Sequence, residues 1–190
     1  MKSGTNKMVS VLNLEQAIFL MAEEVSKRLK AKRLRIVFAE SCTAGLLAAT
    51  LGQIPGISES LCGSAVTYRN ATKAGWLGVD RKLLDDPDIT AVSDPVARQM
   101  AAGVLQMTPE ANLAVSVTGH LGPDAPINQD GIVFVGFLQR EQSEQEMTVH
   151  RIELEASYPE QKQKKASLRV IRQEILVRKI MELLLAFLQQ

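Results

Sequence analysis

Three residues that could do covalent chemistry, Ser41, Tyr68 and Lys73, stand where predicted strands give way to turns or helices. Hydrolysis of an amide or ester by serine requires the nucleophile, a group that takes its proton and donors for the oxyanion. A lysine partly removed from water can serve as that base. If a helix begins between Tyr68 and Lys73, both side chains could face the same crevice as Ser41.

Each of these residues also has an ordinary structural explanation. Ser41 or Thr43 could simply cap a helix, and a lysine five positions after a tyrosine is most often a solvated helix residue. Histidine is the alternative base, and the chain has two. His150 falls in a predicted edge strand, so a Ser-His-Asp triad could use only His120, and no GxSxG elbow accompanies it.

The stretch 36–45, IVFAESCTAG, is predicted to be the corner that carries the nucleophile. Its first four residues form a continuous apolar run, which is typical of a buried strand, and a helix is expected from Ala44. A helix start offers free N–H groups to an anion, so we expect an anion near Thr43. The predicted substrate contacts here are Glu40, Thr43 and Gly45. Because a nearby carboxylate would raise the pKa of Lys73, Glu40 should turn away, toward backbone N–H groups.

The rest of the chain predicts helices that alternate with strands and then a hairpin. Residues 1–12 are expected to be flexible, and residues 13–190 to form one domain. The predicted fold is a three-layer α/β/α sandwich around a mixed, mainly parallel sheet. The expected elements are helices at 13–30, 70–77 and 93–107 and from about 163, and strands at 36–39, 60–68, 113–118, 131–138 and 147–154.

Composition argues against several classes of partner. With 22 basic and 21 acidic residues, no bulk charge attracts nucleic acid or an acidic membrane surface. No segment approaches the roughly 18 apolar residues of a membrane span, and no signal peptide is evident, so a cytoplasmic protein is expected. The two cysteines lack the spacing of a disulfide framework or a zinc site, and we expect no metal or other cofactor.

Five blocks of sequence, in this order, resemble the C-terminal domain of the CinA family, the nicotinamide-nucleotide amidases or NMN deamidases. They lie within AESCTAGLLAATLGQIPGISESLCGSAVTYRNATKAGWLGV, AVSDPVARQMAAGV and SVTGHLGP. The resemblance implies a usually dimeric α/β/α fold that hydrolyses nicotinamide mononucleotide to nicotinate mononucleotide and ammonia without a metal. It also implies that Ser41 is the nucleophile, that Tyr68 and Lys73 assist it, and that Thr118 and Gly119 line the pocket.

The chain departs from the family pattern at three points. Ala44 replaces the first of two glycines, and TGHLGPDAP stands where TGIAGPxGG is usual. EASYPEQKQKK replaces a GDR segment whose arginine suits the substrate phosphate, so Arg172, or otherwise Arg169, is expected to take that role. A second function therefore stays open, namely a nucleotide-binding or regulatory protein that kept the fold and lost turnover.

Overall fold

A five-stranded sheet forms the centre of the computed structural model, which describes residues 5–126, 128–155 and 167–189. The strand order is β2-β1-β3-β4-β5. The strands β2, β1 and β3 run parallel, whereas β4 is antiparallel to β3 and β5 is antiparallel to β4. The strands are β1 (Ile36–Glu40), β2 (Leu61–Val66), β3 (Leu113–Gly119), β4 (Ile132–Gln139) and β5 (Thr148–Glu153).

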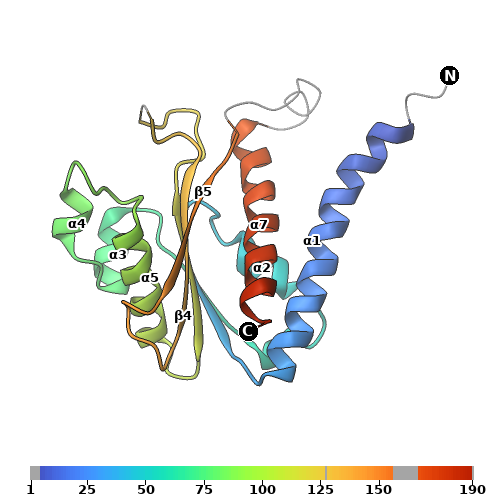
Figure 1. Ribbon diagram of the computed structural model, residues 1–190, viewed down its shortest axis with the longest axis horizontal. Helices are drawn as coiled ribbons and strands as arrows, with labels where there is room; N and C mark the ends of the chain where they lie inside the picture. The colour runs from blue at the N-terminus through green and yellow to red at the C-terminus, as the bar shows by residue number, and fades with distance from the viewer. Residues whose placement is uncertain (1–4, 127, 156–166, 190) are drawn as a thin grey trace.

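Helices cover both faces of this sheet, which confirms the predicted three-layer α/β/α fold (Figure 1). One face carries α1 (Thr5–Ala31), α2 (Leu46–Gly52) and α7 (Leu168–Phe187). The other carries α3 (Asn70–Leu77), α4 (Arg81–Asp85) and α5 (Asp94–Met107). A short 3₁₀ helix, η1 (Ile57–Glu59), leads into β2. None of the helices in the described ranges is long and apolar enough to cross a membrane.

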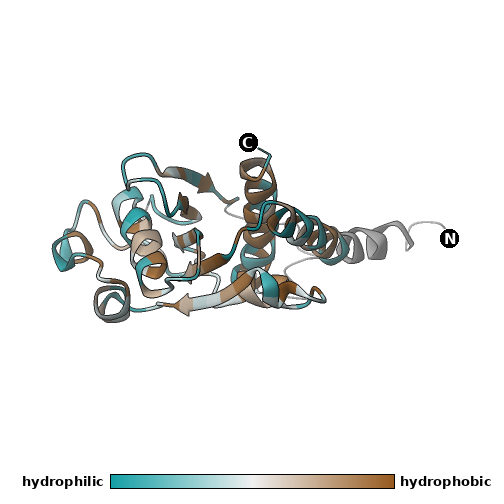
Figure 2. Ribbon diagram, turned by 90° about the horizontal axis from the view of Figure 1, so that it is seen from below, coloured by the Kyte–Doolittle hydropathy of each residue, from teal (hydrophilic) through white to brown (hydrophobic). Residues whose placement is uncertain are grey.

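Strand β1 shows why its sequence is apolar without alternation. Ile36 and Phe38 pack into the core shared with α1, α2 and α7, whereas Val37 and Ala39 pack into the core on the α5 side. A strand that is buried on both faces has no position for a solvated side chain. In Figure 2 the central strands are mostly brown, and teal is concentrated on the outer helices and the loops.

Three helix starts differ from the prediction. Helix α7 begins at Leu168, with Ser167 as its N-cap, rather than at about Gln163. Helix α1 begins at Thr5 rather than at Asn13, so residues 5–12 continue the helix instead of preceding it. Helix α2 begins at Leu46 rather than at Ala44, because Ala44 and Gly45 both have positive φ and cannot belong to a right-handed helix. In contrast, α3 spans 70–77 and ends at the left-handed Gly78 as its sequence predicts.

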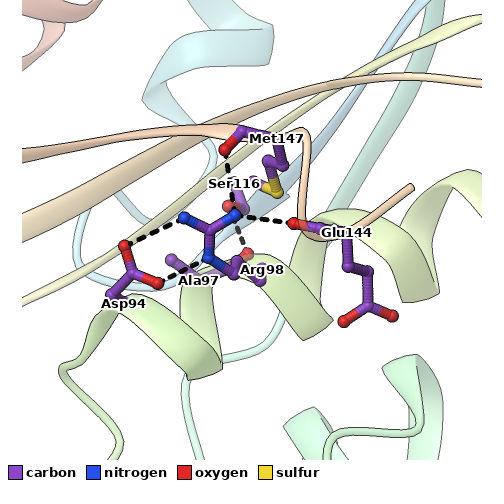
Figure 3. A network of polar contacts seen from close by, with 6 residues as sticks. All are labelled: Asp94, Ala97, Arg98, Ser116, Glu144 and Met147. Atoms are coloured by element: carbon purple, nitrogen blue, oxygen red, sulfur yellow. Dashed lines mark hydrogen bonds and ion pairs between the residues drawn. The ribbon is translucent and has the colours of Figure 1, made fainter. Parts of the chain in front are cut away.

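The start of α5 is tied to the hairpin between β4 and β5 by one arginine (Figure 3). The Nε atom of Arg98 lies 2.6 Å from the Oδ1 atom of Asp94. Its Nη1 atom donates to the carbonyl oxygens of Glu144, at 2.6 Å, and Met147, at 2.9 Å. The ion pair lies within α5, and the two bonds to carbonyl oxygens join this helix to the hairpin. Neither Asp94 nor Arg98 lines the cavity described below.

Candidate active site

The corner after β1 is built on the side chain of Glu40, which is fully buried. Its carboxylate accepts hydrogen bonds from the backbone N–H groups of Gly45 at 2.9 Å, Leu47 at 3.1 Å and Ala48 at 3.1 Å. It also accepts a bond from the hydroxyl of Ser64. Glu40 therefore caps α2 and turns toward backbone N–H groups, as expected.

This capping corrects three predictions about the same corner. Neither Ser41 nor Thr43 caps the helix, because Glu40 does so from beneath it. The N–H groups expected to bind an anion are already bonded to that carboxylate. Glu40, Thr43 and Gly45 were expected to contact the substrate, but none of them lines the cavity. Glu40 and Gly45 shape the turn instead, and Thr43 keeps an unbonded backbone N–H group in the described part of the chain.

Ser41 and Lys73 meet at the end of the sheet. The Nζ atom of Lys73 lies 3.0 Å from the Oγ atom of Ser41 and 2.9 Å from the carbonyl oxygen of Thr67. Both side chains are buried, with Lys73 2% and Ser41 8% exposed. Lys73 comes from α3, on one face of the sheet, and Ser41 follows β1, in the middle layer. The predicted approach of these two residues is therefore present.

Burial lowers the pKa of Lys73 to about 8. Removal from water disfavours the ammonium form, and no carboxylate in the described part of the chain forms an ion pair with this amine. Glu40, the acidic residue next to Ser41 in the sequence, is held by α2. A substantial fraction of Lys73 is therefore neutral near physiological pH, and in that form it can accept the proton of the Ser41 hydroxyl.

Cys42, the neighbour of Ser41, is not a competing nucleophile. Burial raises the pKa of its thiol to about 12, so the reactive thiolate is scarce. Its carbonyl oxygen accepts a 2.9 Å hydrogen bond from the side chain of Gln173, which ties the turn to α7. Among hydrogen bonds within the described ranges, none uses the backbone N–H groups of Cys42 or Thr43 as donors.

A cavity of about 330 Å³ opens at this end of the sheet, within the size range of small-molecule sites. Thr118 and Gly119 line it, as predicted. The Thr118 hydroxyl donates to the carbonyl oxygen of Ala91 at 2.7 Å, which holds the strand end against the segment before α5. The lining residues are Ser41, Cys42, Tyr68, Asn70, Lys73, Ala91, Val92, Thr118, Gly119, His120, Leu121, Gly122, Asp124, Ala125 and Arg169.

Tyr68 lines the cavity too, but no hydrogen bond in the described part of the chain joins it to Ser41 or Lys73. Its side chain is 55% exposed, and its hydroxyl accepts a hydrogen bond from Arg169. The guanidinium carbon of Arg169 lies 5.9 Å from the centroid of the tyrosine ring. Arg169 also donates to the carbonyl oxygen of Gly122 at 3.2 Å, so it connects two sides of the cavity.

Arg172, the first choice for a phosphate ligand, does not line the cavity. Its side chain is fully buried and forms an ion pair with Asp130. The sequence contained a signal for this burial, because Arg172 lies on the i, i+4 row of the buried residues Leu176, Ile180 and Leu184. Arg169 lies outside that row and reaches the cavity.

The loop after β3 supplies further lining residues that the sequence motifs do not assign to the site. His120 is half-buried, and burial lowers the pKa of its imidazole. No hydrogen bond in the described part of the chain joins it to Ser41, so the two do not form a triad. His150 lies on β5 and packs edge-on against Phe137. Asn70 and Asp124 line the cavity without a sequence motif that could have identified them.

Comparison with known proteins identifies the family of this chain. The family model described as the CinA C-terminal domain matches residues 19–175. CinA-like proteins of Mycobacterium marinum and Mycobacterium avium are 47% and 50% identical over 115 and 101 residues, which is 60% and 53% of this chain. The matches span only 26% and 22% of the length of those relatives.

Solved structures agree with the family match. The competence/damage inducible protein CihA of Agrobacterium tumefaciens has a TM-score of 0.78 and 31% identity, covering 92% of this chain and 96% of its own. A CinA superfamily protein of Klebsiella pneumoniae has a TM-score of 0.77 at 24% identity, covering 90% and 98%, and supports the fold alone. Because the family model matches well over half of the sequence, the chain belongs to the CinA C-terminal domain family.

Proposed function

We propose that this protein is a serine amidohydrolase that converts nicotinamide mononucleotide to nicotinate mononucleotide and ammonia. The observation that carries the proposal is the 3.0 Å contact between the Ser41 hydroxyl and the buried Lys73 amine at the cavity. A hydroxyl is a weak nucleophile unless a base takes its proton. Family membership supports the assignment, and the resemblance of the sequence blocks names the substrate.

In the first half of the reaction, the Ser41 Oγ atom attacks the carboxamide carbon while neutral Lys73 takes the hydroxyl proton. The resulting lysine ammonium then gives that proton to the departing nitrogen as the carbon–nitrogen bond breaks. Ammonia leaves and an acyl-serine ester remains. The carbonyl oxygen of Thr67, 2.9 Å from Nζ, holds the amine in place through both steps.

In the second half, a water molecule attacks the ester carbonyl carbon. Neutral Lys73 takes a proton from this water and returns it to Ser41 Oγ as the ester bond breaks. The direct product is the pyridine carboxylic acid, which releases its remaining proton to solvent and leaves as the carboxylate, and the dyad is restored. The cavity is open to solvent on the side of Tyr68, which is 55% exposed, so water can reach the ester.

The tetrahedral intermediates require donors for the negative oxygen. We assign this role to the backbone N–H groups of Cys42 and Thr43, which follow the nucleophile and bond to no other residue in the described ranges. The bond from Gln173 to the Cys42 carbonyl keeps this turn in one conformation. Preorganised donors of this kind lower the barrier without reorganising during the reaction.

Arg169 is the residue that we assign to the substrate phosphate. Apart from the buried Lys73 it is the only lysine or arginine lining the cavity in the described part of the chain. Its guanidinium contacts Tyr68 and Gly122, both cavity residues. A phosphate that takes the place of the tyrosine hydroxyl would free Tyr68 to approach Lys73, which is the assisting role that the resemblance implies.

The alternative is a nucleotide-binding protein without turnover. The observation that favours it concerns Tyr68, the expected assisting residue, whose hydroxyl bonds to Arg169 and, within the described ranges, to neither Ser41 nor Lys73. A homodimer and a cytoplasmic location belong to the same proposals. Light scattering of the purified protein tests the first, and fractionation of the cells that produce it tests the second.

The deciding experiment measures ammonia released from nicotinamide mononucleotide by the purified protein. Ser41→Ala and Lys73→Met should each lower kcat by about three orders of magnitude, and the double variant should be little worse, because members of one catalytic unit do not add. Circular dichroism checks that each variant is folded. Binding of the nucleotide without ammonia release would favour the alternative, and full activity of Ser41→Ala would exclude the serine mechanism.

A further inference from the structure

The loop between β3 and β4 forms one wall of the cavity, and an ion pair links this loop to α7. The loop contributes His120, Leu121 and Gly122 to the lining. Near its far end, Asp130 meets Arg172 of α7. We call this pair the Asp130–Arg172 clasp.

The clasp has the geometry of a strong, directional interaction. The Nη1 and Nη2 atoms of Arg172 donate to the two carboxylate oxygens of Asp130 at 2.6 and 2.8 Å. The Nε and Nη2 atoms also donate to the carbonyl oxygen of Glu155 at 3.1 and 2.9 Å. Arg172 is fully buried, so its guanidinium is held by the protein alone. A two-pronged pair of this kind fixes orientation as well as distance.

The wall of the cavity rests directly on this clasp. A Cβ atom added to Gly122 would lie 2.7 Å from Oδ1 of Asp130 and 2.8 Å from Nη1 of Arg172. The loop backbone at Gly122, which lines the cavity, is therefore in close contact with both partners. Leu121, beside it, is 1% exposed and packs into the core. Because protein interiors are closely packed, a displacement of Asp130 or Arg172 should also displace the loop backbone at Gly122.

Helix α7 contacts both the loop and the turn that carries Ser41. In the first two turns of α7, Arg169 donates to the carbonyl of Gly122, and Gln173 donates to the carbonyl of Cys42, next to the nucleophile. The spacing between the loop and the Ser41 turn is thus set through α7. Arg172 lies between these two residues and supplies the charged contact.

We propose that the Asp130–Arg172 clasp is a positioning device that sets the distance between the substrate-facing loop and the serine turn. This proposal rests on the proposed function, because it predicts how the substrate is held. Neither residue lines the cavity, so neither is a catalytic residue. Loosening the clasp should weaken substrate binding while leaving the Ser41–Lys73 pair intact.

The test compares Asp130→Asn with the matched control Asp94→Asn. Each removes one carboxylate that lies 2.6 Å from an arginine, and the two aspartate side chains are similarly exposed, at 37% and 43%. Of the two aspartates, only Asp130 belongs to the loop that lines the cavity. Hydrogen–deuterium exchange over residues 119–131 should quicken about tenfold in Asp130→Asn and stay unchanged in the control. The amides to follow are those of His120 and Gly131, which bond to Ile132 and His120.

Steady-state kinetics with nicotinamide mononucleotide form the second readout. Asp130→Asn should raise KM about tenfold with kcat within about threefold, because binding and not chemistry is weakened. Should Asp130→Asn fail to fold, Asp130→Glu keeps the charge, lengthens the arm by one methylene and should shift KM in the same direction. Unchanged exchange, or a loss confined to kcat, overturns the clasp. Faster exchange in a protein that releases no ammonia supports the clasp and rejects the proposed function instead.

Discussion

At the scale of single residues, Lys73 combines two requirements that oppose each other. It must be buried to lie 3.0 Å from Ser41, and burial destabilises its charged form. The free-energy cost of burying the charged amine is not offset by a counter-ion, because no carboxylate in the described part of the chain forms an ion pair with Lys73. A carboxylate beside the amine would raise the pKa of Lys73, so that less of the lysine would be neutral and able to accept a proton.

The first prediction is that activity follows the protonation state of Lys73. With the pKa at about 8, kcat/KM should rise about tenfold per pH unit below that value and level off above it, since only the neutral amine accepts a proton. The measurement is kcat/KM between pH 6 and 10. A rate independent of pH across this interval would assign the proton to another group.

The second prediction concerns the stability of Lys73→Met. The pKa of Lys73 is lower in the folded protein than its usual value of about 10.4 in an unfolded chain, so the unfolded chain binds the proton more tightly. The lysine therefore costs stability fully below pH 8, and less as the pH rises toward the unfolded value. Lys73→Met should raise the free energy of unfolding at pH 7 by about 1 kcal/mol while abolishing turnover.

Urea denaturation at pH 7 and pH 10 measures this effect. The advantage of Lys73→Met should shrink at the higher pH, because the folded lysine is neutral there and the buried charge that costs stability at pH 7 is gone. Ser41→Ala is the matched control, because it removes the other half of the pair and keeps the buried amine. The difference in stability between Ser41→Ala and the unsubstituted protein should therefore be the same at both pH values. An equal gain at both values would trace the effect to packing.

At the scale of elements, the corner between β1 and α2 carries strain at one residue. Ala44 has a φ of 54°, a left-handed conformation that costs a residue with a Cβ about 1–2 kcal/mol. The following Gly45, with a φ of 97°, tolerates the same region freely. The strain is confined to the tip of the turn, three residues beyond Ser41.

The third prediction is that Ala44→Gly stabilises the protein by about 0.5–1 kcal/mol, the relief of strain less the added freedom of the unfolded chain. Ala49→Gly is the control, because Ala49 is exposed within α2 and the same substitution there should cost about 1 kcal/mol. Denaturation midpoints measure both. Two changes of the same sign would mean that the turn stores no strain.

Elements with local signals could be predicted from the sequence, and those set by distant contacts could not. Strand β1 and helix α3 have an apolar run and a Gly78 cap within their own residues. The start of α2 depends on a carboxylate placed before a turn of unusual φ, which no helix pattern encodes. Likewise Arg169 and Arg172 share a helix. The i, i+4 row of apolar residues on that helix indicates that Arg172 is the buried one, whereas its distant partner Asp130 could not be predicted from the sequence.

At the scale of the whole molecule, two hydrophobic cores share one sheet. Leu29 of α1 is fully buried in the first core, and Leu77, at the end of α3, lies in the second. Strand β1 sends alternate side chains into both, so neither core can dissolve while the other persists. The domain should therefore unfold in a single transition.

The fourth prediction uses the single tryptophan to test this coupling. Trp76 lies on α3, on the face opposite to α1. Leu29→Ala should lower the free energy of unfolding by about 3 kcal/mol and shift the Trp76 fluorescence and circular dichroism midpoints together. Leu20→Ala, at a 56% exposed position of the same helix, should change stability by less than about 0.5 kcal/mol. Separate midpoints for the two probes would mean that the cores melt independently.

The placement of the reacting pair in different layers has a thermal consequence. Ser41 sits on the sheet and is braced by α7 through Cys42, whereas Lys73 is carried by α3 on the opposite face. The distance between Ser41 Oγ and Lys73 Nζ therefore depends on how the layers pack against each other. Warming loosens the packing between layers before it breaks strands or helices. Proton transfer requires a short distance between donor and acceptor, so a small increase in that distance slows it. Catalysis in such an architecture should fade several degrees below the melting point, as a loss of alignment rather than a loss of fold.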